Sequence, residues 1–287
     1  MDGHKNVTAV FGITNNSGAD YRFQLNLTSS IGNPPDLQNI GAGNVYASES
    51  VDGFTQWVLQ YPLHNGVHLQ PTTGVIPTNI YTIVMLFRLD QITAYRRLVD
   101  FKAGTSDFGL YANNGSLNFY PVVNAPTATI AAGNYVQVVL TRDGTNVVGY
   151  VNGVQQFNFA DNNNYGVISS ANDLRFFKDD STSDDDSGAI ARIRLYDAAM
   201  PPGQVALLDR TIGGIAQPVF DAPYIDLGIL RLPAHNLIPG TTYRLLYSSN
   251  LLDWLNLTTN TPPANPFTFA DPFGPTNVSR FYRLVTP

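Results

Sequence analysis

The sequence contains no cysteine, which excludes disulfide bridges, thiolate metal sites and cysteine nucleophiles. It also has no run of about 18 apolar residues, the length that a membrane-spanning helix needs, so we expect no membrane insertion. Basic residues are few, because 16 Lys and Arg stand against 22 Asp and Glu and give a net charge of −6. Such a chain offers no electrostatic footprint for a phosphate backbone, and nucleic acid is excluded as a partner.

Charged residues of either sign are scarce, at 13% of the chain compared with about 25% in an average globular protein. Glutamate is represented by Glu49 alone, and Asn, Thr, Ser, Gly and Gln supply most of the polarity. A surface of this kind is common on extracellular β-proteins. We therefore predict a secreted protein, located outside the cell or on its surface, whose partner is a glycan or a cell-surface or matrix protein.

The sequence does contain a long series of strand patterns punctuated by Gly, Asn, Asp and Pro. In TRDGTNVVGYVNGVQQFNF, residues 141–159, the dipeptides Asp143-Gly144 and Asn152-Gly153 lie between alternating apolar and polar residues. This pattern predicts three antiparallel strands joined by tight turns. Residues 81–89, YTIVMLFRL, are apolar on both faces and are expected to form a central, covered strand. The helix signal is short and lies at residues 201–209.

Two domains are predicted from the 287 residues. The first series of strands ends near residue 197, and a stretch with Gly and Pro follows the helix signal before a second, shorter series begins. The fold class is therefore all-β. We expect an antiparallel jelly-roll sandwich over residues 1–209, a linker over residues 210–223 and a second, small β-sandwich over residues 224–287.

The first series of strands also resembles a known family. The resemblance rests on seven stretches, which in chain order are NGVHLQP, YTIVMLFRLD, YRRLVDFKAGTSDFGLY, NGSLNFYP, YVQVVLTRDGTNVVGYVNGVQQF, LRFFKDD and SGAIARIRLYDAAMPPGQVALL. With them, residues 45–209 resemble the laminin-G-like domains of the concanavalin-A-like lectin and glucanase superfamily. The resemblance implies a jelly roll but no single function, since the superfamily includes lectins, glycosidases, polysaccharide lyases and adhesion modules.

The second series carries a looser resemblance through YRLLYSSNLLDWLNL and RFYRLVTP. Residues 224–287 look like the small β-sandwich appended to many bacterial exported proteins. That resemblance implies a spacer or a surface-display module.

A role as a glycan-cleaving enzyme would require a suitable pair of carboxylates. Glucanases of the superfamily use two glutamates in an E-x-D-x-x-E pattern, which a chain with only Glu49 cannot form. Asp100 and Asp107 are the best local pair of aspartates, although such residues more often cap turns. No stretch matches lyase motifs, so we assign no catalytic residue and expect no catalysis, with a polysaccharide lyase or hydrolase as the alternative.

Calcium is the candidate cofactor, because the segment KDDSTSDDDSG, residues 178–188, concentrates carboxylates. Asp180, Asp184 and Asp186 are predicted to supply oxygen ligands from a curled loop, since calcium takes six to eight hard oxygen atoms. The segment does not have EF-hand spacing. The alternative is a metal-free loop in which the like charges remain solvated.

Sugar recognition uses aromatic faces with polar side chains that bond hydroxyl groups. Alternation of side chains places Arg175 and Phe177 on one face of LRFFKDD, and it places Arg192, Arg194 and Tyr196 on the outer face of IARIRLYD. The predicted binding residues are these five together with Tyr111 and Tyr120. The alternative for the arginines is an ion-pair network with Asp173, Asp179 and Asp197.

Non-catalytic extracellular recognition, by glycan binding or surface adhesion, is therefore the preferred function. A polysaccharide-degrading enzyme is the second hypothesis. The third is a structural protein that assembles a surface or matrix through exposed sheet edges.

Overall fold

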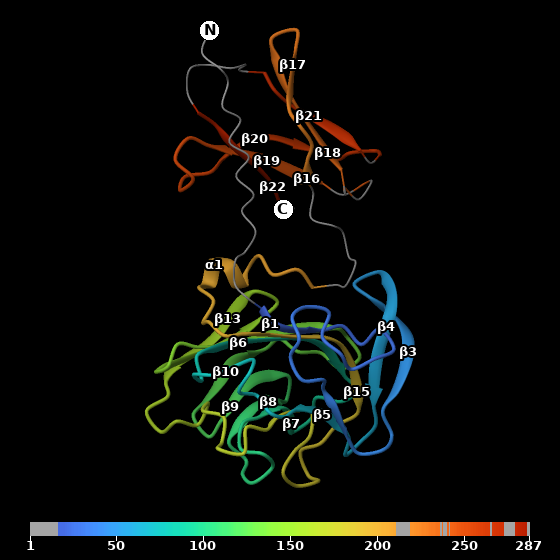
Figure 1. Ribbon diagram of the computed structural model, residues 1–287, viewed down its shortest axis with the longest axis vertical. Coiled ribbons are helices and arrows are strands. Elements are labelled where there is room, and N and C mark those ends of the chain that lie inside the picture. Colours follow the sequence, from blue (N-terminus) through green and yellow to red (C-terminus); the bar gives the residue numbers. More distant parts are fainter. Residues whose placement is uncertain are drawn as a thin grey trace. The chain divides into compact units, whose positions relative to one another are not determined.

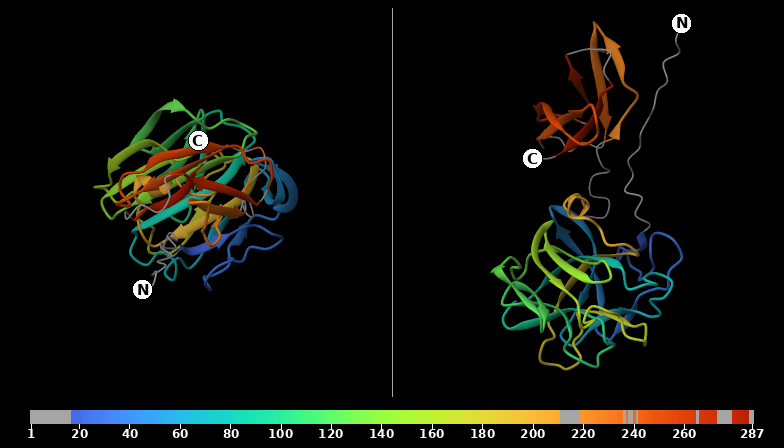
Figure 2. Two further views of the ribbon diagram at one scale, coloured as in Figure 1. Left: turned by 90° about the horizontal axis from the view of Figure 1, so that it is seen from above. Right: turned by 90° about the vertical axis from the view of Figure 1, so that its left-hand side faces the viewer.

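The computed structural model describes residues 17–210, 219–235, 237, 240, 242–264, 266–272 and 279–285. The chain divides between Ile212 and Gly213 into two compact units. Each unit has its own sheets (Figures 1 and 2). Each unit also has its own hydrophobic core. Among the described residues, no helix has the length and apolar character needed to cross a membrane. The domain limits at residues 209 and 224 stay a prediction.

The larger unit contains two antiparallel sheets, and the first, sheet A, has eight strands in the order β13-β12-β11-β6-β15-β4-β3, with β1 also paired to β15. The strands are β1 Ser17–Tyr21, β3 Val45–Val51, β4 Phe54–Tyr61, β6 Tyr81–Leu89, β11 Val136–Arg142, β12 Asn146–Val151, β13 Val154–Ala160 and β15 Gly188–Tyr196. The predicted three-stranded meander is β11-β12-β13. Its second turn is tight because Asn152 and Gly153 both have positive φ, 49° and 79°.

The second sheet of the larger unit, sheet B, has seven strands in the order β10-β9-β8-β7-β14-β5-β2. Its strands are β2 Gln38–Ile40, β5 Gly66–Leu69, β7 Tyr95–Asp100, β8 Gly109–Asn113, β9 Ser116–Tyr120, β10 Val123–Ala128 and β14 Leu174–Phe176. Segments far apart in sequence meet here, since β14 lies between β7 and β5.

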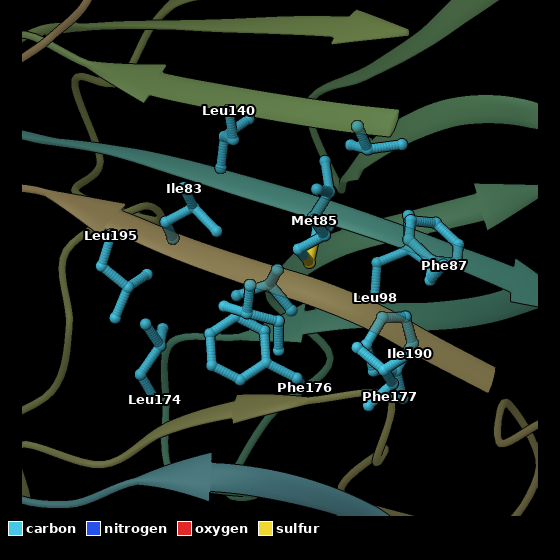
Figure 3. Close-up of a cluster of buried hydrophobic side chains, with 14 of the residues drawn as sticks. Ile83, Met85, Phe87, Leu98, Leu140, Leu174, Phe176, Phe177, Ile190 and Leu195 are labelled. Carbon is cyan, nitrogen blue, oxygen red and sulfur yellow. The ribbon is translucent and has the colours of Figure 1, made fainter. Parts of the chain in front are cut away.

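The main core lies between sheets A and B and is filled by side chains spaced two apart. From β6, alternate residues point towards sheet B and meet side chains from β7 and β14 (Figure 3). The labelled members are Ile83, Met85, Phe87, Leu98, Leu140, Leu174, Phe176, Phe177, Ile190 and Leu195. This arrangement confirms the prediction of an all-β sandwich with residues 81–89 as a central strand.

The outer face of sheet A is also covered. Val84, Val139, Tyr150 and Tyr196 pack against Met200, Val205 and Leu208, which follow β15 in the chain. This covering segment contains the helix α1, Pro202–Val205, a single turn within the residues predicted to be helical. The outward residues of β6, such as Val84 and Leu86, are therefore buried as well.

The smaller unit contains two further antiparallel sheets. One has the order β16-β18-β17 with β21 paired to β18, and the other has the order β20-β19-β22. The strands are β16 Val219–Phe220, β17 Tyr224–Asp226, β18 Ile229–His235, β19 Tyr243–Ser248, β20 Leu255–Asn260, β21 Phe267–Asp271 and β22 Phe281–Val285. A separate core forms around Leu232, Tyr243, Leu245 and Phe269. Strand β16 lies within the residues predicted to be linker.

Candidate functional site

The outer face of sheet B carries polar and aromatic side chains in two rows. Because alternate residues of each strand fill the core, their neighbours face away from it. One row, defined by strand register, is Arg97, Tyr111, Asn118 and Asn124, and the other is His68, Arg175, Asp100, Gly109 and Tyr120. This face therefore gathers groups able to make hydrogen bonds and ring contacts.

Three tyrosines on this face, the tyrosine cluster, contact one another edge to face. Ring centres are 5.5 Å apart for Tyr95 and Tyr111, 5.9 Å for Tyr95 and Tyr120, and 6.3 Å for Tyr111 and Tyr120. Tyr111 is 1% exposed, whereas Tyr120 is 37% exposed. The packed rings hold Tyr120 in place while leaving part of its surface accessible.

Arg97 lies beside the tyrosine cluster and is fully buried. Its guanidinium carbon is 4.2 Å from the centre of the Tyr111 ring, and its Nη2 is 2.7 Å from Asp179 Oδ1 and 3.0 Å from Asp180 Oδ1. It also donates to the carbonyls of Ser106, Asp107 and Phe108. Arg97 thus fixes two loops, residues 102–108 and 178–187, against the outer face of sheet B.

These two loops bring together three carboxylates, the carboxylate cluster, from Asp107, Asp179 and Asp184. One oxygen from each lies within 4.8 Å of the others. The cluster offers three of the six to eight oxygen ligands that calcium takes. With Asp180 and Asp185, five carboxylates of the two loops lie near two cations, Arg97 and Lys178. The donor set and the excess negative charge therefore fit a hard divalent cation.

The protonation behaviour of the two loops reflects this crowding. Burial, followed by the charge of Asp179, raises the pKa of Asp180 to about 6 and also raises the pKa of Asp184. Burial acts in the same direction on Asp179, but the hydroxyl of Ser181 and the guanidinium of Arg97 outweigh it and lower its pKa to about 2. Of these three carboxylates, Asp179 therefore keeps its charge to the lowest pH.

Of the three predicted metal ligands, the structure brings only Asp184 into the carboxylate cluster. Asp180 pairs with Arg97, and Asp186 accepts hydrogen bonds from the backbone N–H groups of Gln91 and Ser187. Sequence reasoning missed Asp107 and Asp179 as ligands, because they are 72 residues apart and only the folded loops bring them together.

Asp100, the other half of the local aspartate pair, caps the loop that follows β7. Its two carboxylate oxygens accept the N–H groups of Lys102 and Gly104, each at 2.6 Å. This geometry is that of a turn aspartate.

Arg175, Tyr111 and Tyr120 do lie on the outer face of sheet B, within its two rows of outward side chains. Phe177 does not, and its predicted outward orientation was wrong. Strand β14 ends at Phe176, and a φ of 62° at Phe177 breaks the alternation, so its ring turns inward and stacks on Tyr61 with centres 5.0 Å apart. Phe177 is 1% exposed.

Arg192, Arg194 and Tyr196, which were also predicted to bind, do not lie with Arg175 on sheet B, because β15 belongs to sheet A. Arg192 Nε is 2.7 Å from Asp20 Oδ1, and both arginines contact Asp209, at 2.7 and 2.6 Å. Tyr196 packs under the covering segment. The ion-pair alternative is thus correct for Arg175, which pairs with Asp173 at 2.8 Å. For Arg192 and Arg194 it is correct in kind, but their partners are Asp20 and Asp209.

Comparison with known proteins places this architecture in a family. Residues 64–206 match the laminin G model described as the concanavalin A-like lectin/glucanases superfamily. This part of the chain belongs to that superfamily. The match spans β5 to α1 and so includes both loops of the carboxylate cluster and every member of the tyrosine cluster.

Solved structures share the superfamily fold. Domain 4 of AbnA, a GH43 extracellular arabinanase from Geobacillus stearothermophilus solved with arabinotriose, has a TM-score of 0.51 and 19% identity, covering 66% of this chain and 96% of that chain. The binding domain of botulinum neurotoxin serotype G has a TM-score of 0.51 and 11% identity, and the match covers 80% of this chain and 56% of that chain. No curated protein matches the sequence. Identities this low establish the fold alone, and the superfamily assignment does not fix a ligand.

Proposed function

We propose that the larger unit binds glycans, without cleaving them, through the outer face of sheet B, and that it does so outside the cell or on its surface. The observation that carries the proposal is the position of Tyr111 between the tyrosine cluster and the carboxylate cluster. Its ring edge meets the partly exposed Tyr120, while its hydroxyl lies 3.0 Å from the Asp107 carbonyl and 3.3 Å from Asp179 Oδ1. One buried residue thus joins an accessible aromatic ring to the carboxylate cluster.

Each component suits a sugar. An aromatic face packs against the C–H groups of a pyranose or furanose ring, and short amide side chains bond its hydroxyl groups. Asn118 and Asn124 lie next to Tyr111 in the same row, and Asn124 is exposed. The face is shallow, so we expect each site to bind weakly.

A cation is the proposed second element. Asp107, Asp179 and Asp184 would hold Ca²⁺, which would offset the excess negative charge and order the two loops beside the tyrosine cluster. Asp107 is exposed, and the remaining ligands of such an ion would be water or glycan oxygens.

Support for the choice of ligand comes from the similar arabinanase domain, which was solved with arabinotriose. That domain shares the fold at 19% identity, and arabinose-containing glycans are therefore the first to test. The superfamily match supports the same class of function.

The test is a glycan array probed with the full chain in calcium and in EGTA. We expect binding to a restricted set of glycans, a loss of about ten-fold in affinity for Tyr120→Ala, and a weaker signal in EGTA. Tyr224→Ala is the matched control, because Tyr224 is 51% exposed but belongs to the smaller unit. Absence of glycan binding, or equal effects of the two substitutions, would refute the proposal.

A further inference from the structure

A depression opens at one rim of sheet A, away from the tyrosine cluster. It forms where the ends of β3, β4, β6 and β15 meet, and it has a volume of about 380 Å³. Its lining includes Val45, Gln60, Tyr61, Arg88, Asp90 and Ser187. A water molecule occupies about 30 Å³, so the space exceeds what one ordered water would fill.

The hydroxyl of Tyr61 is the unusual group in this rim depression. It is buried, and it has no hydrogen-bond partner among the residues that the structure describes. Other buried tyrosines have one, since Tyr81 Oη lies 2.9 Å from the Gly166 carbonyl and Tyr21 Oη lies 2.7 Å from the Pro35 carbonyl. A buried polar group without a partner is costly and rare, which points to a partner that the chain itself does not supply.

Access to this hydroxyl depends on the absence of a side chain at Gly188. A Cβ atom there would lie 2.6 Å from Tyr61 Oη and 2.2 Å from the Arg88 carbonyl. Gly188 and Tyr61 both line the depression, so the tyrosine hydroxyl lies next to a lining residue that carries no side chain.

Charge restricts the class of occupant. The Arg88 guanidinium is already neutralised, because it binds both carboxylate oxygens of Glu49 at 2.9 Å and also contacts Asp90. Glu49 is further fixed by Gln60 and Tyr135. The two carboxylates of Asp90 and Glu49 outnumber the one guanidinium of Arg88, so this side of the depression carries a net negative charge. An anionic ligand would therefore be repelled.

The polar groups that remain suit hydroxyl groups. Asp90 accepts from Ser187 Oγ at 2.6 Å and, as a carboxylate that is 42% exposed, has further acceptor capacity. The Tyr61 hydroxyl can donate or accept. Val45 and Pro62 offer an apolar surface on the same lining. A molecule with several hydroxyl groups and a small C–H face could bond the carboxylate and the tyrosine hydroxyl and also pack on the apolar surface.

We propose that the rim depression binds one neutral sugar residue, with the Tyr61 hydroxyl and the Asp90 carboxylate as its polar contacts. The volume is at the lower end for ligand pockets, which fits a single sugar residue rather than an oligosaccharide. This site shares no residue with the tyrosine cluster or the carboxylate cluster, although Ser187 stands at the end of the loop that carries Asp179 and Asp184.

The test is an NMR titration of the full, ¹⁵N-labelled chain with the methyl glycosides of glucose, galactose, mannose and arabinose. We expect at least one of them to cause saturable shifts at the amides of Gly43, Val45 and Gly188. Tyr61→Phe keeps the ring and should weaken this binding at least five-fold, while Tyr81→Phe, which removes a bonded hydroxyl elsewhere, should leave it unchanged. Methyl glucuronide, with its negative charge, should bind at least ten-fold more weakly than the neutral glycoside.

The other outcomes overturn the proposal. They are no saturable shift at these amides with any of the four glycosides, unchanged affinity in Tyr61→Phe despite a native spectrum, and binding of the glucuronide as tight as that of the neutral sugar. Tyr120→Ala separates the two sites. If it abolished the shifts at Gly43 and Gly188, they would arise from sheet B and the rim site would be rejected, whereas the glycan face would stand.

Discussion

The guanidinium of Arg97 stacks on the ring of Tyr111, 4.2 Å from its centre. Both side chains are buried on the outer face of sheet B, where a charged group is stable only if it is paired. Arg97 meets this condition through Asp179, whose side chain is fully buried as well. The stacked pair thus connects the tyrosine cluster to the carboxylate cluster, and it makes Arg97 the residue on which both loops depend.

Arg97→Gln should destabilise the larger unit by about 3 kcal/mol, because it leaves the buried carboxylate of Asp179 without its cation. Urea denaturation followed by Trp57 fluorescence, in a Trp254→Phe background, would measure this loss in the larger unit alone. Arg175→Gln is the matched control on the same face. Arg175 is 28% exposed and its pair with Asp173 should be worth less than about 1 kcal/mol, so equal losses would contradict the buried role of Arg97.

Calcium affinity should rise with pH. The pKa of Asp180 is raised to about 6 by burial and then by Asp179, and the pKa of Asp184 is raised in the same direction, so protons compete with a cation near Asp107 and Arg97. A group with a pKa of about 6 is mostly ionised at pH 7 and mostly protonated at pH 5, which predicts about ten-fold weaker binding at pH 5. Calorimetric titration with calcium at both pH values would measure the difference in affinity. Asp180→Asn removes a group that titrates in this range, so it should make the difference smaller. Equal affinity at the two pH values would contradict this arrangement.

Much of the fold could be predicted from the sequence because alternation is a local property. Residues 81–89 are apolar on both faces, and the structure buries both faces of β6. The turn at Asn152-Gly153 was equally predictable, since few other dipeptides adopt positive φ twice. These features depend on neighbours in the chain and need no knowledge of distant contacts.

The site was less predictable because its parts come from different elements. Alternation failed at Phe177, where a single residue with positive φ turns the side chain into the core. It also could not assign Arg175 and Arg192 to different sheets, because strand pairing is set by long-range contacts. Asp107 and Asp179 meet only after both loops fold around Arg97.

Asp20→Asn should destabilise the larger unit by about 3 kcal/mol, since Asp20 and Arg192 are paired with side chains 4% and 8% exposed. Burial opposes ionisation of Asp20, but the bonds and charge of Arg192, together with Arg22, lower its pKa below the usual 3.8. Its contribution to stability is therefore present above about pH 4 and is lost as the pH falls through the lowered pKa.

The substitution should accordingly flatten the acid limb of the stability profile, measured by urea denaturation between pH 2 and pH 6. Asp52→Asn is the control, because Asp52 pairs with Arg210 at a site where both side chains are about 30% exposed. A loss below about 1 kcal/mol is expected there. An unchanged acid limb in Asp20→Asn would contradict the proposed role of the buried pair.

Tyr61→Phe and Tyr81→Phe should differ in their effect on stability although both remove one buried hydroxyl. Tyr81 Oη donates to the Gly166 carbonyl, so its loss should cost about 1 kcal/mol and leave that carbonyl without its donor. Tyr61 Oη has no partner among the described residues, and its removal should be neutral or slightly stabilising in buffer. The same urea experiment measures both variants. If Tyr61→Phe lost as much stability as Tyr81→Phe, the Tyr61 hydroxyl would already be bonded within the chain or to a structural water, and it would not be available to a ligand at the rim of sheet A.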